Sequence, residues 1–400
     1  MITSLEDLLA PYPYLRVAND ADNEEILEFL KTVPMETGGM ALRHDRAPDY
    51  FAFSKRQGKK DFCLVMGNKD RTIGGIASLS IRDYYVNRQK AKVAYLGDLR
   101  IHPRLYRRTR VNWRNLYVDL VNNYRNIRDF DNCEYFYTAI LENNRSAINA
   151  LTKGKSKFIY RELGVYQAVH ILFRLPGFGM FRTARQVSNG IGAVRRAAQG
   201  DMAPLREFLY EQNKNKPFYD YITREGDDEL ERRCQAWDDF SISSFVIVEN
   251  NDHEIIGCVS PWSHDAVRRL VLDKCSLKDR ALSAILPIVG SSPLINGNTI
   301  HTLNLSHFEI KDNLDARVRK KVFRMLIEFI FSTRMHKGYH LISLLDYAGN
   351  SLGSILRNSG FITKTTRGVI YQVMSPDDMA EGHFIPTKEG ICPHFELAVA

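Results

Sequence analysis

Residues 95–112 read YLGDLRIHPRLYRRTRVN. The apolar residues between 93 and 101 predict a strand, and the spacing of Leu116, Leu120 and Tyr124 predicts a helix after it. A strand that runs into a helix presents unpaired backbone N–H groups at the start of the helix, where the helix dipole also favours negative charge. The stretch therefore predicts an anion-binding site at this junction.

The junction is rich in arginine, which pairs with phosphate oxygens through two parallel hydrogen bonds. Five guanidinium groups lie within eleven residues: Arg104, Arg107, Arg108, Arg110 and Arg114. A phosphate-bearing cofactor is the interpretation that best fits this cluster. A solvated basic surface, or contact with RNA or a membrane, are the alternatives.

The rest of the first half reads as mixed α and β. Apolar runs predict strands at 15–18, 62–66, 72–77, 135–141 and 165–173, and a polar turn at 142–144 precedes a short helix ending near Leu151. An apolar stripe at Ile26, Leu27 and Leu30 predicts the first helix, and residues 35–58 are expected to form loop and short helix.

The order of these elements begins again after residues 176–190, which contain Pro-Gly-Phe-Gly and Ser-Asn-Gly. Residues 15–18 are echoed by 194–197, 62–71 by 245–253, and 73–75 by 255–257. The common offset of about 180 residues is the size of a domain, so it indicates duplication rather than a short repeat. The sequence predicts an N-terminal domain at 1–178, a linker at 179–190 and a C-terminal domain at 191–400.

Composition agrees with two globular domains. The chain has 400 residues, of which 44% are hydrophobic and 26% charged. No apolar run is long enough for a membrane helix, and the acidic N-terminus does not resemble a signal peptide. The six cysteines are scattered and never form Cys-x-x-Cys, so we expect a reducing, cytoplasmic location. The net charge of +8 favours a polyanionic partner, either nucleic acid or a phosphate-rich cofactor.

The order strand, helix, hairpin, long strand, helix, strand, helix, strand resembles the GNAT acyltransferase fold. Residues 95–112 resemble the fourth strand of that family and the pyrophosphate-binding loop after it. Residues 144–151 and 350–361 resemble, in each half, the helix after the fifth strand. The resemblance implies an α/β fold with mixed sheets, present as two tandem GNAT domains. It also implies an N-acyltransferase, most simply an acetyltransferase, that uses acetyl-CoA or another acyl-CoA as co-substrate.

The resemblance also assigns cofactor contacts to three parts of the first half. The contacts fall on the end of the strand, on the loop and helix start, and on the next helix: Leu99, Arg100, Ile101, Arg107, Arg108, Thr109, Arg110, Val111, Asn112 and Asn144. Two features depart from the family pattern. The glycine positions of the loop are occupied by Arg110 and Asn112. The family tyrosine that often protonates the leaving thiolate would fall at Leu151 in the first half and near Arg357 in the second half. Neither position is a tyrosine.

Catalysis requires that the acceptor amine lose a proton before it attacks a thioester. A carboxylate whose pKa is raised by burial can accept that proton, directly or through water. Asp98 in the strand is the first candidate, with pairing to Arg100 or Lys92 as its structural alternative, and Glu142 at the end of the next strand is the second. Tyr160 and Tyr166 are candidates for protonating the thiolate, although packing is their simpler role.

The acceptor is expected to bind at residues 44–51, where charged and aromatic side chains alternate. His44, Asp45 and Arg46 are the predicted contacts. The histidines lack the spacing of metal ligands, so no metal is predicted. We expect a small-molecule or peptide amine as partner, and no membrane.

The second half is expected to be catalytically silent. Asp312 and Asp315 lie where phosphates would bind in its counterpart loop, and carboxylates repel phosphate at close range. His307 and Glu309 are predicted to lie at the interface between the domains. The final residues, 392–400, are apolar enough to pack, although some enzymes with duplicated GNAT-like domains use a C-terminal carboxylate as base.

Two other functions fit the same sequence. A tRNA-dependent aminoacyltransferase of the Fem type would suit the basic charge, but nucleic acid is not the favoured partner. A degenerate GNAT pair that only binds a metabolite or a protein would suit the missing glycines and tyrosines.

Overall fold

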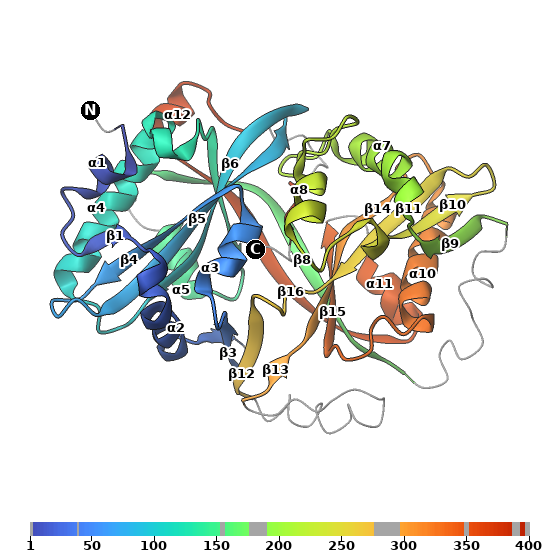
Figure 1. Ribbon diagram of the computed structural model, residues 1–400, viewed down its shortest axis with the longest axis horizontal. Coiled ribbons are helices and arrows are strands. Elements are labelled where there is room, and N and C mark those ends of the chain that lie inside the picture. The colour runs from blue at the N-terminus through green and yellow to red at the C-terminus, as the bar shows by residue number, and fades with distance from the viewer. Residues whose placement is uncertain are drawn as a thin grey trace.

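A computed structural model describes residues 3–37, 40–152, 157–175, 190–275, 297–347, 352–385 and 393–396 (Figure 1). Its strands form a 12-stranded mixed sheet and a 4-stranded sheet. The order in the large sheet is β1-β4-β5-β6-β7-β16-β8-β15-β14-β11-β10-β9. The predicted α/β fold with a mixed sheet is confirmed.

The two halves of the sequence build the two ends of the large sheet in the same way. The first half supplies β1 (Leu15–Val17), β4 (Lys60–Gly67), β5 (Ile73–Val86), β6 (Gln89–Ile101) and β7 (Tyr135–Leu141). The second supplies β9 (Gly192–Arg196), β10 (Val246–Asn250), β11 (Ile255–Trp262), β14 (Thr302–Ile310) and β15 (Leu341–Tyr347). Each series is antiparallel except for its last pair, β6–β7 or β14–β15, which is parallel. The duplication inferred from the sequence therefore extends to strand direction.

The two halves exchange their last strands at the centre of the sheet. β8 (Ile159–Arg174) belongs to the first half by sequence but pairs with β15, and β16 (Phe361–Met374) belongs to the second but pairs with β7. The two strands also pair with each other, and they appear in Figure 1 as the long green and red ribbons between the halves. At their crossing, a Cβ atom on Gly368 would lie 2.4 Å from the Tyr166 ring, so only glycine permits this approach. The exchange makes the large sheet continuous.

Two long helices cover equivalent places in the halves. α4 (Arg107–Asn123) packs Trp113, Leu116 and Leu120 into a core that includes α1 (Leu5–Leu9) and strand residues such as Phe136. α10 (Ala316–Ser332) does the same in the second half, with α11 (Leu352–Asn358) beside it. Each long helix follows a sheet strand directly, as the periodicity after residue 112 predicted for the first half. Shorter helices complete the layers: α2 (Asn23–Thr32), α3 (Tyr50–Gln57), α5 (Arg145–Leu151), α7 (Met202–Asn213), α8 (Glu229–Ala236) and α12 (Pro376–Ala380).

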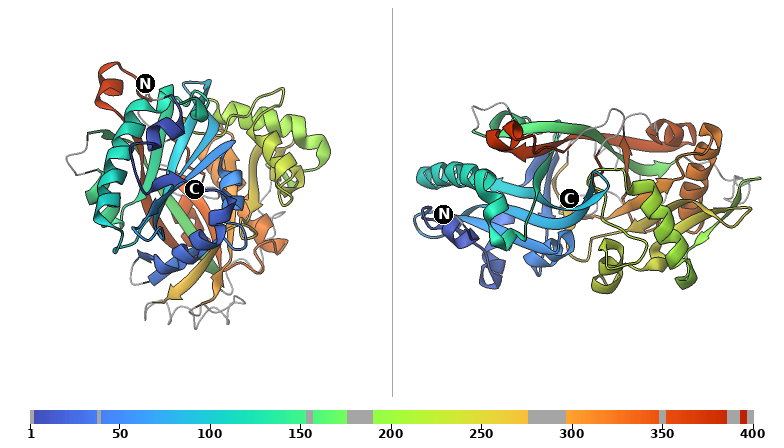
Figure 2. Two further views of the ribbon diagram at one scale, coloured as in Figure 1. Left: turned by 60° about the vertical axis from the view of Figure 1, so that its left-hand side comes forward. Right: turned by 90° about the horizontal axis from the view of Figure 1, so that it is seen from above.

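The small sheet joins the halves a second time (Figure 2). It contains β2 (Met35–Thr37), β3 (Met40–Asp45), β12 (Arg269–Lys274) and β13 (Thr299–Ile300), and its central pair β3–β12 crosses between the halves. Two ion pairs reinforce that contact: Arg43 Nε lies 2.8 Å from Asp273, and Arg269 Nη2 lies 2.8 Å from Asp45. The prediction of loop between residues 35 and 49 was wrong, because strand partners more than 200 residues away order this segment. None of the described helices is long and apolar enough to cross a membrane.

Candidate active site

β6 and β7 diverge after a short parallel contact. They pair only between residues 93–95 of β6 and 135–137 of β7, although β6 continues to Ile101. The gap is bridged at its narrow end, where Thr138 Oγ1 donates a 2.8 Å hydrogen bond to the Leu96 carbonyl. Beyond this hydrogen bond, the described part of β6 has no strand partner on the edge that faces β7. Its backbone N–H and C=O groups can therefore bind an extended ligand that carries amides, as a free sheet edge does.

Asp98 forms a β-bulge at the mouth of this gap. Gly97 is opposite Ser78 and Arg100 is opposite Ile76, so two residues of β6 face one residue of β5. Asp98 has a φ of +49°, the left-handed conformation, and the bulge turns the strand away from β7. The second half repeats the feature at His307, which has a φ of +47° between residues 306 and 309 of β14. Both halves thus carry a bulged strand beside a gap.

The side chain of Asp98 pairs with Arg46, which is only 1% exposed. Burial alone would raise the pKa of Asp98, but Arg46, followed by Arg100 and Arg268, holds it below its usual range. The alternative partner proposed from the sequence, Lys92, pairs with Asp131 instead. The structure therefore gives Asp98 the opposite pKa shift from the one that the general-base hypothesis assumed.

Of the three predicted acceptor contacts, Arg46 is the one that reaches Asp98. Its guanidinium lies 4.8 Å from the ring centroids of Tyr50 and Phe53, and its Nε and Nη1 atoms have no hydrogen-bond partner among the described residues. Asp45 turns away to accept a hydrogen bond from Arg269. The Nδ1 atom of His44 is buried, and burial together with nearby arginines lowers its pKa well below the usual value. This residue is therefore neutral in the folded protein.

Arg268 is a neighbour of this cluster that the sequence did not suggest. Its guanidinium lies 3.8 Å from the Phe53 ring centroid, and burial followed by the charge of Arg46 lowers its pKa to about 9. It lies just before β12, in the other half of the sequence. No local pattern distinguishes it, because only the β3–β12 contact brings it to Asp98.

The start of α4 lies beyond the open end of the gap and is not capped by a side chain. Tyr106 occupies the N-cap position without a side-chain hydrogen bond. Arg107 and Arg108 follow it, and both are exposed with no ion pair to any described residue. The helix start therefore combines free N–H groups with two available guanidinium groups, as an anion site requires.

The other predicted loop contacts hold the loop itself in place. Thr109 Oγ1 donates to the Gly67 carbonyl at 2.8 Å, and Asn112 Nδ2 donates to the Pro13 carbonyl at 3.0 Å. Arg110 donates to the carbonyls of His102 and Pro103. These three side chains shape the junction. Arg107 and Arg108 remain exposed there without an ion pair to any described residue, as do Arg104 and Arg114.

Apolar side chains are exposed along the same gap. Only eight large hydrophobic residues among those described are exposed, and four of them lie on β6, α4 and β7 around the opening: Leu99, Ile101, Val111 and Leu141. Glu142 and Asn144 lie further along, where Glu142 approaches Arg367 at 3.5 Å and Asn144 caps α5 through Ala147. Glu142 is therefore a surface residue, and the structure does not bring it together with Asp98.

The equivalent place in the second half is organised differently. Asp315 caps α10 by accepting a 2.8 Å hydrogen bond from the Arg317 backbone N–H, and Asp312 pairs with Arg319. A carboxylate of the chain thus occupies the helix start that would otherwise bind a phosphate. The acids singled out in the sequence take the position predicted for them.

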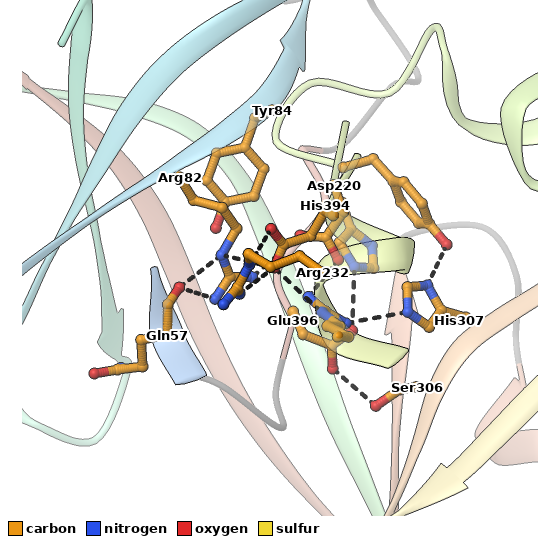
Figure 3. Close-up of polar contacts among 12 residues, drawn as sticks. Gln57, Arg82, Tyr84, Asp220, Arg232, Ser306, His307, His394 and Glu396 are labelled. Carbon is orange, nitrogen blue, oxygen red and sulfur yellow. Dashed lines mark hydrogen bonds and ion pairs between the residues drawn. The ribbon is translucent and has the colours of Figure 1, made fainter. Parts of the chain in front are cut away.

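A buried polar network lies between the halves, around the second bulge (Figure 3). Asp220 accepts from Arg82 at 3.1 Å and from Arg233 at 2.5 Å, which joins the two halves. His307 contacts Tyr219 OH at 2.8 Å and Arg233 at 3.1 Å, and burial lowers its pKa to about 4. Oxygen and nitrogen atoms of Asp220, His307 and Glu396 lie within 4.8 Å of one another, a spacing that would suit a metal ion. The guanidinium of Arg233 already supplies the positive charge there.

Residues 393–396 enter this network from the far end of the sequence. The His394 backbone N–H donates to the Pro217 carbonyl at 2.7 Å, and Glu396 accepts from Ser306 at 3.0 Å. Phe395 is buried against Tyr95 and Tyr166. Packing of this segment was expected from its apolar composition, but its position at the centre of the molecule was not.

The search for similar sequences gave no match to a protein-family model or to a curated protein. Solved structures do resemble the chain. N-myristoyltransferase from Saccharomyces cerevisiae with bound myristoyl-CoA aligns with a TM-score of 0.55 and 13% identity over 91% of this chain and 79% of that one. A GCN5-related N-acetyltransferase from Sphaerobacter thermophilus aligns with a TM-score of 0.51 and 14% identity over 90% and 96% of the two chains.

A fungal GCN5-related glucosamine N-acetyltransferase region also aligns, with a TM-score of 0.57 and 10% identity, over 90% of this chain and 38% of that protein. Identities this low establish the fold and not the substrate. Together with the duplicated bulge, the duplicated gap and the repeated strand order, they show that this chain has the tandem GNAT fold.

Proposed function

We propose that the protein is an acyl-CoA-dependent N-acyltransferase whose chemistry takes place in the first half. The observation that supports this most strongly is the difference between the two helix starts. α4 begins with free N–H groups and unpaired Arg107 and Arg108, whereas α10 is capped by Asp315. Among the residues that the structure describes, those of the first half alone offer a phosphate site at the end of a bulged and open strand.

The acyl-CoA would lie along the gap between β6 and β7. Its phosphates would bind at the start of α4, and its amide-bearing arm would pair with the free backbone edge from Leu99 to Ile101. The exposed side chains of Val111 and Leu141 would contact the aliphatic parts of the arm. This orientation places the thioester at the bulge, beside Asp98.

The acceptor amine would approach from the side of Asp98 and Arg46. The ionised carboxylate attracts the ammonium form of the acceptor, and the ammonium loses a proton to water. The neutral amine then attacks the thioester carbonyl and the new C–N bond forms. The C–S bond breaks, the proton that the attacking nitrogen loses reaches the sulfur through water, and CoA leaves as the thiol. Arg46 fixes the Asp98 carboxylate and holds its pKa low. The carboxylate therefore positions the acceptor by its charge and does not itself hold the proton.

Isothermal titration of acetyl-CoA into the wild-type protein and an Arg107→Ala/Arg108→Ala variant tests the site. Each lost phosphate contact should cost about 1 kcal/mol or more, so we expect at least about tenfold weaker binding in the double variant. The matched control is Arg317→Ala/Lys321→Ala on α10, which removes two exposed positive charges from the equivalent helix. Equal weakening in the two variants would contradict the site. An absence of binding by any acyl-CoA would favour a degenerate binding protein.

A further inference from the structure

Aromatic side chains close the narrow end of the gap between β6 and β7. Tyr95 and Tyr137 are the last paired residues of the two strands, and their ring centroids are 5.2 Å apart. The Tyr84 hydroxyl lies 3.0 Å from the Tyr137 hydroxyl, and Phe395 packs at 4.7 Å from the ring of Tyr166 and 6.1 Å from that of Tyr95. We call these five residues the aromatic floor.

The space beside the aromatic floor is small. A cavity of about 10 Å³ is lined by four of the floor residues, all except Tyr166, and by the polar residues Gln57, Ser80, Arg82 and Glu396. That volume is comparable to the room that one water molecule needs. A Cβ atom on Gly97 would lie 2.7 Å from the Tyr95 ring, so this glycine lets the ring lie along β6 toward the bulge. The ring therefore reaches the place where an acyl group would end.

The opposite face of the strands is closed as well. Phe136, the neighbour of Tyr137 in β7, is fully buried in the core beneath α4 together with Leu116 and Leu120. Leu96 of β6 packs against the same core. A long acyl chain that entered the gap would therefore have to displace close-packed side chains on either face, and overpacking of this kind is unfavourable.

Phe395 is the member of the aromatic floor that is held from outside the first half. The residues on both sides of it are anchored, His394 through the Pro217 carbonyl and Glu396 through Ser306. Burial alone would raise the pKa of Glu396, but a hydrogen bond with His394, followed by the charges of Arg233 and His307, lowers it and favours the ionised form. Moving Phe395 out of the way would require breaking these contacts, so the floor resists an incoming chain.

We infer that the aromatic floor limits the acyl group to a short chain, and that Phe395 sets this limit. The inference rests on the proposed function, since it assumes that the thioester lies at the bulge. It separates this protein from its structural neighbour with bound myristoyl-CoA. On this inference an acetyl group ends in front of the rings, whereas each further methylene would have to be accommodated among them.

Titration of acetyl-, butyryl-, octanoyl- and myristoyl-CoA against wild type and Phe395→Ala tests the limit, with unacylated CoA as the reference ligand. The wild type should bind acetyl-CoA at least about tenfold more tightly than octanoyl-CoA, and the variant should lose that preference. Phe384→Ala, which truncates an exposed phenylalanine outside the floor, should keep the wild-type preference.

Wild-type protein that binds octanoyl- or myristoyl-CoA as tightly as acetyl-CoA would overturn the inference and leave the proposed function standing. Binding of no acyl-CoA would overturn both. If Phe395→Ala does not fold, Phe395→Leu replaces it, because leucine keeps the apolar packing but shortens the floor. A chain-length preference unchanged in the folded variant would assign the limit to other residues and overturn the role of Phe395.

Discussion

Asp98 occupies a position where one residue defines both the shape and the charge of the candidate site. Its left-handed backbone produces the bulge. Its carboxylate is ionised because the positive charge of the buried Arg46 side chain stabilises the anion. Arg46 lies 52 residues earlier in the sequence, at the end of β3. The sequence indicated both residues separately, but it could not show that they form a pair, because the pairing depends on how α3 and β3 fold over the sheet.

Replacing Asp98 by asparagine should lower kcat/KM by about 100-fold, because the acceptor loses its carboxylate while the bulge is retained. Asparagine also tolerates the left-handed backbone. The affinity for acyl-CoA should not change, and the loss should be constant between about pH 6 and 9, since the pKa of Asp98 lies below that range.

Steady-state kinetics and titration of acetyl-CoA measure these effects. Circular dichroism establishes whether the variant still folds when Arg46 has lost its carboxylate partner. Asp131→Asn is the control, because Asp131 also has a left-handed backbone and pairs with a lysine on the surface. A variant with wild-type kcat/KM would remove Asp98 from the reaction.

At the scale of elements, the junction from β6 to α4 could be predicted from the sequence and the central strands could not. Apolar periodicity and clustered arginines mark residues 93–124 without reference to the rest of the chain. The alternation of residues in β8 predicts a strand equally well, but it does not say which strand lies beside it. The partners of β8 are β15 and β16, both more than 165 residues later in the sequence, and this order follows from global packing alone.

The pairing of β8 with β15 should make stability depend on pH. His170 Nδ1 lies 2.8 Å from Ser343 Oγ across these strands, and burial, with a smaller effect of Lys364, lowers the pKa of His170 to about 4. An unfolded histidine has a pKa near 6.5, so between these values the unfolded chain binds more protons than the folded one. Stability is therefore lost as the pH falls from about 6.5 toward 4.

Urea denaturation at several pH values measures this dependence. His170→Asn should reduce the slope of unfolding free energy against pH in that window by up to about 1.4 kcal/mol per pH unit. The pH dependence of stability that remains in this variant includes the contribution of His307, whose pKa is also about 4. His253→Asn, at an exposed turn residue with a left-handed backbone, is the control variant. An unchanged slope in His170→Asn would show that His170 does not titrate in this way.

At the scale of the whole molecule, the two halves are not independent structures. They share a continuous sheet, the β3–β12 contact and the buried Arg82–Asp220 pair, which is at most 2% exposed. Removal of one partner of such a pair typically costs about 3–5 kcal/mol. The candidate site reflects the same arrangement, because Arg268 and Phe395 reach the first half from the second.

Residues 1–178 expressed alone should therefore fail to unfold cooperatively. Without the second half, β7 loses its neighbour β16, and β8 loses both of its neighbours. Size-exclusion chromatography and urea denaturation, monitored by tryptophan fluorescence from Trp113, should show an aggregated or expanded chain. Co-expression with residues 190–400 should restore a compact complex. A monomeric 1–178 fragment with a cooperative transition would contradict this expectation.

The strand exchange also affects how the protein is made. When β7 leaves the ribosome, the strand that will lie beside it begins about 220 residues further along the chain. At the usual 5–20 residues per second, β7 then waits roughly 10 to 40 s with an open hydrogen-bonding edge. During that interval β7 can pair with β8 or with another nascent chain, as exposed strand edges tend to do. Chaperone binding to the emerging first half, or slow translation through residues 142–360, should therefore influence the yield of correctly folded protein more than the stability of the finished structure does.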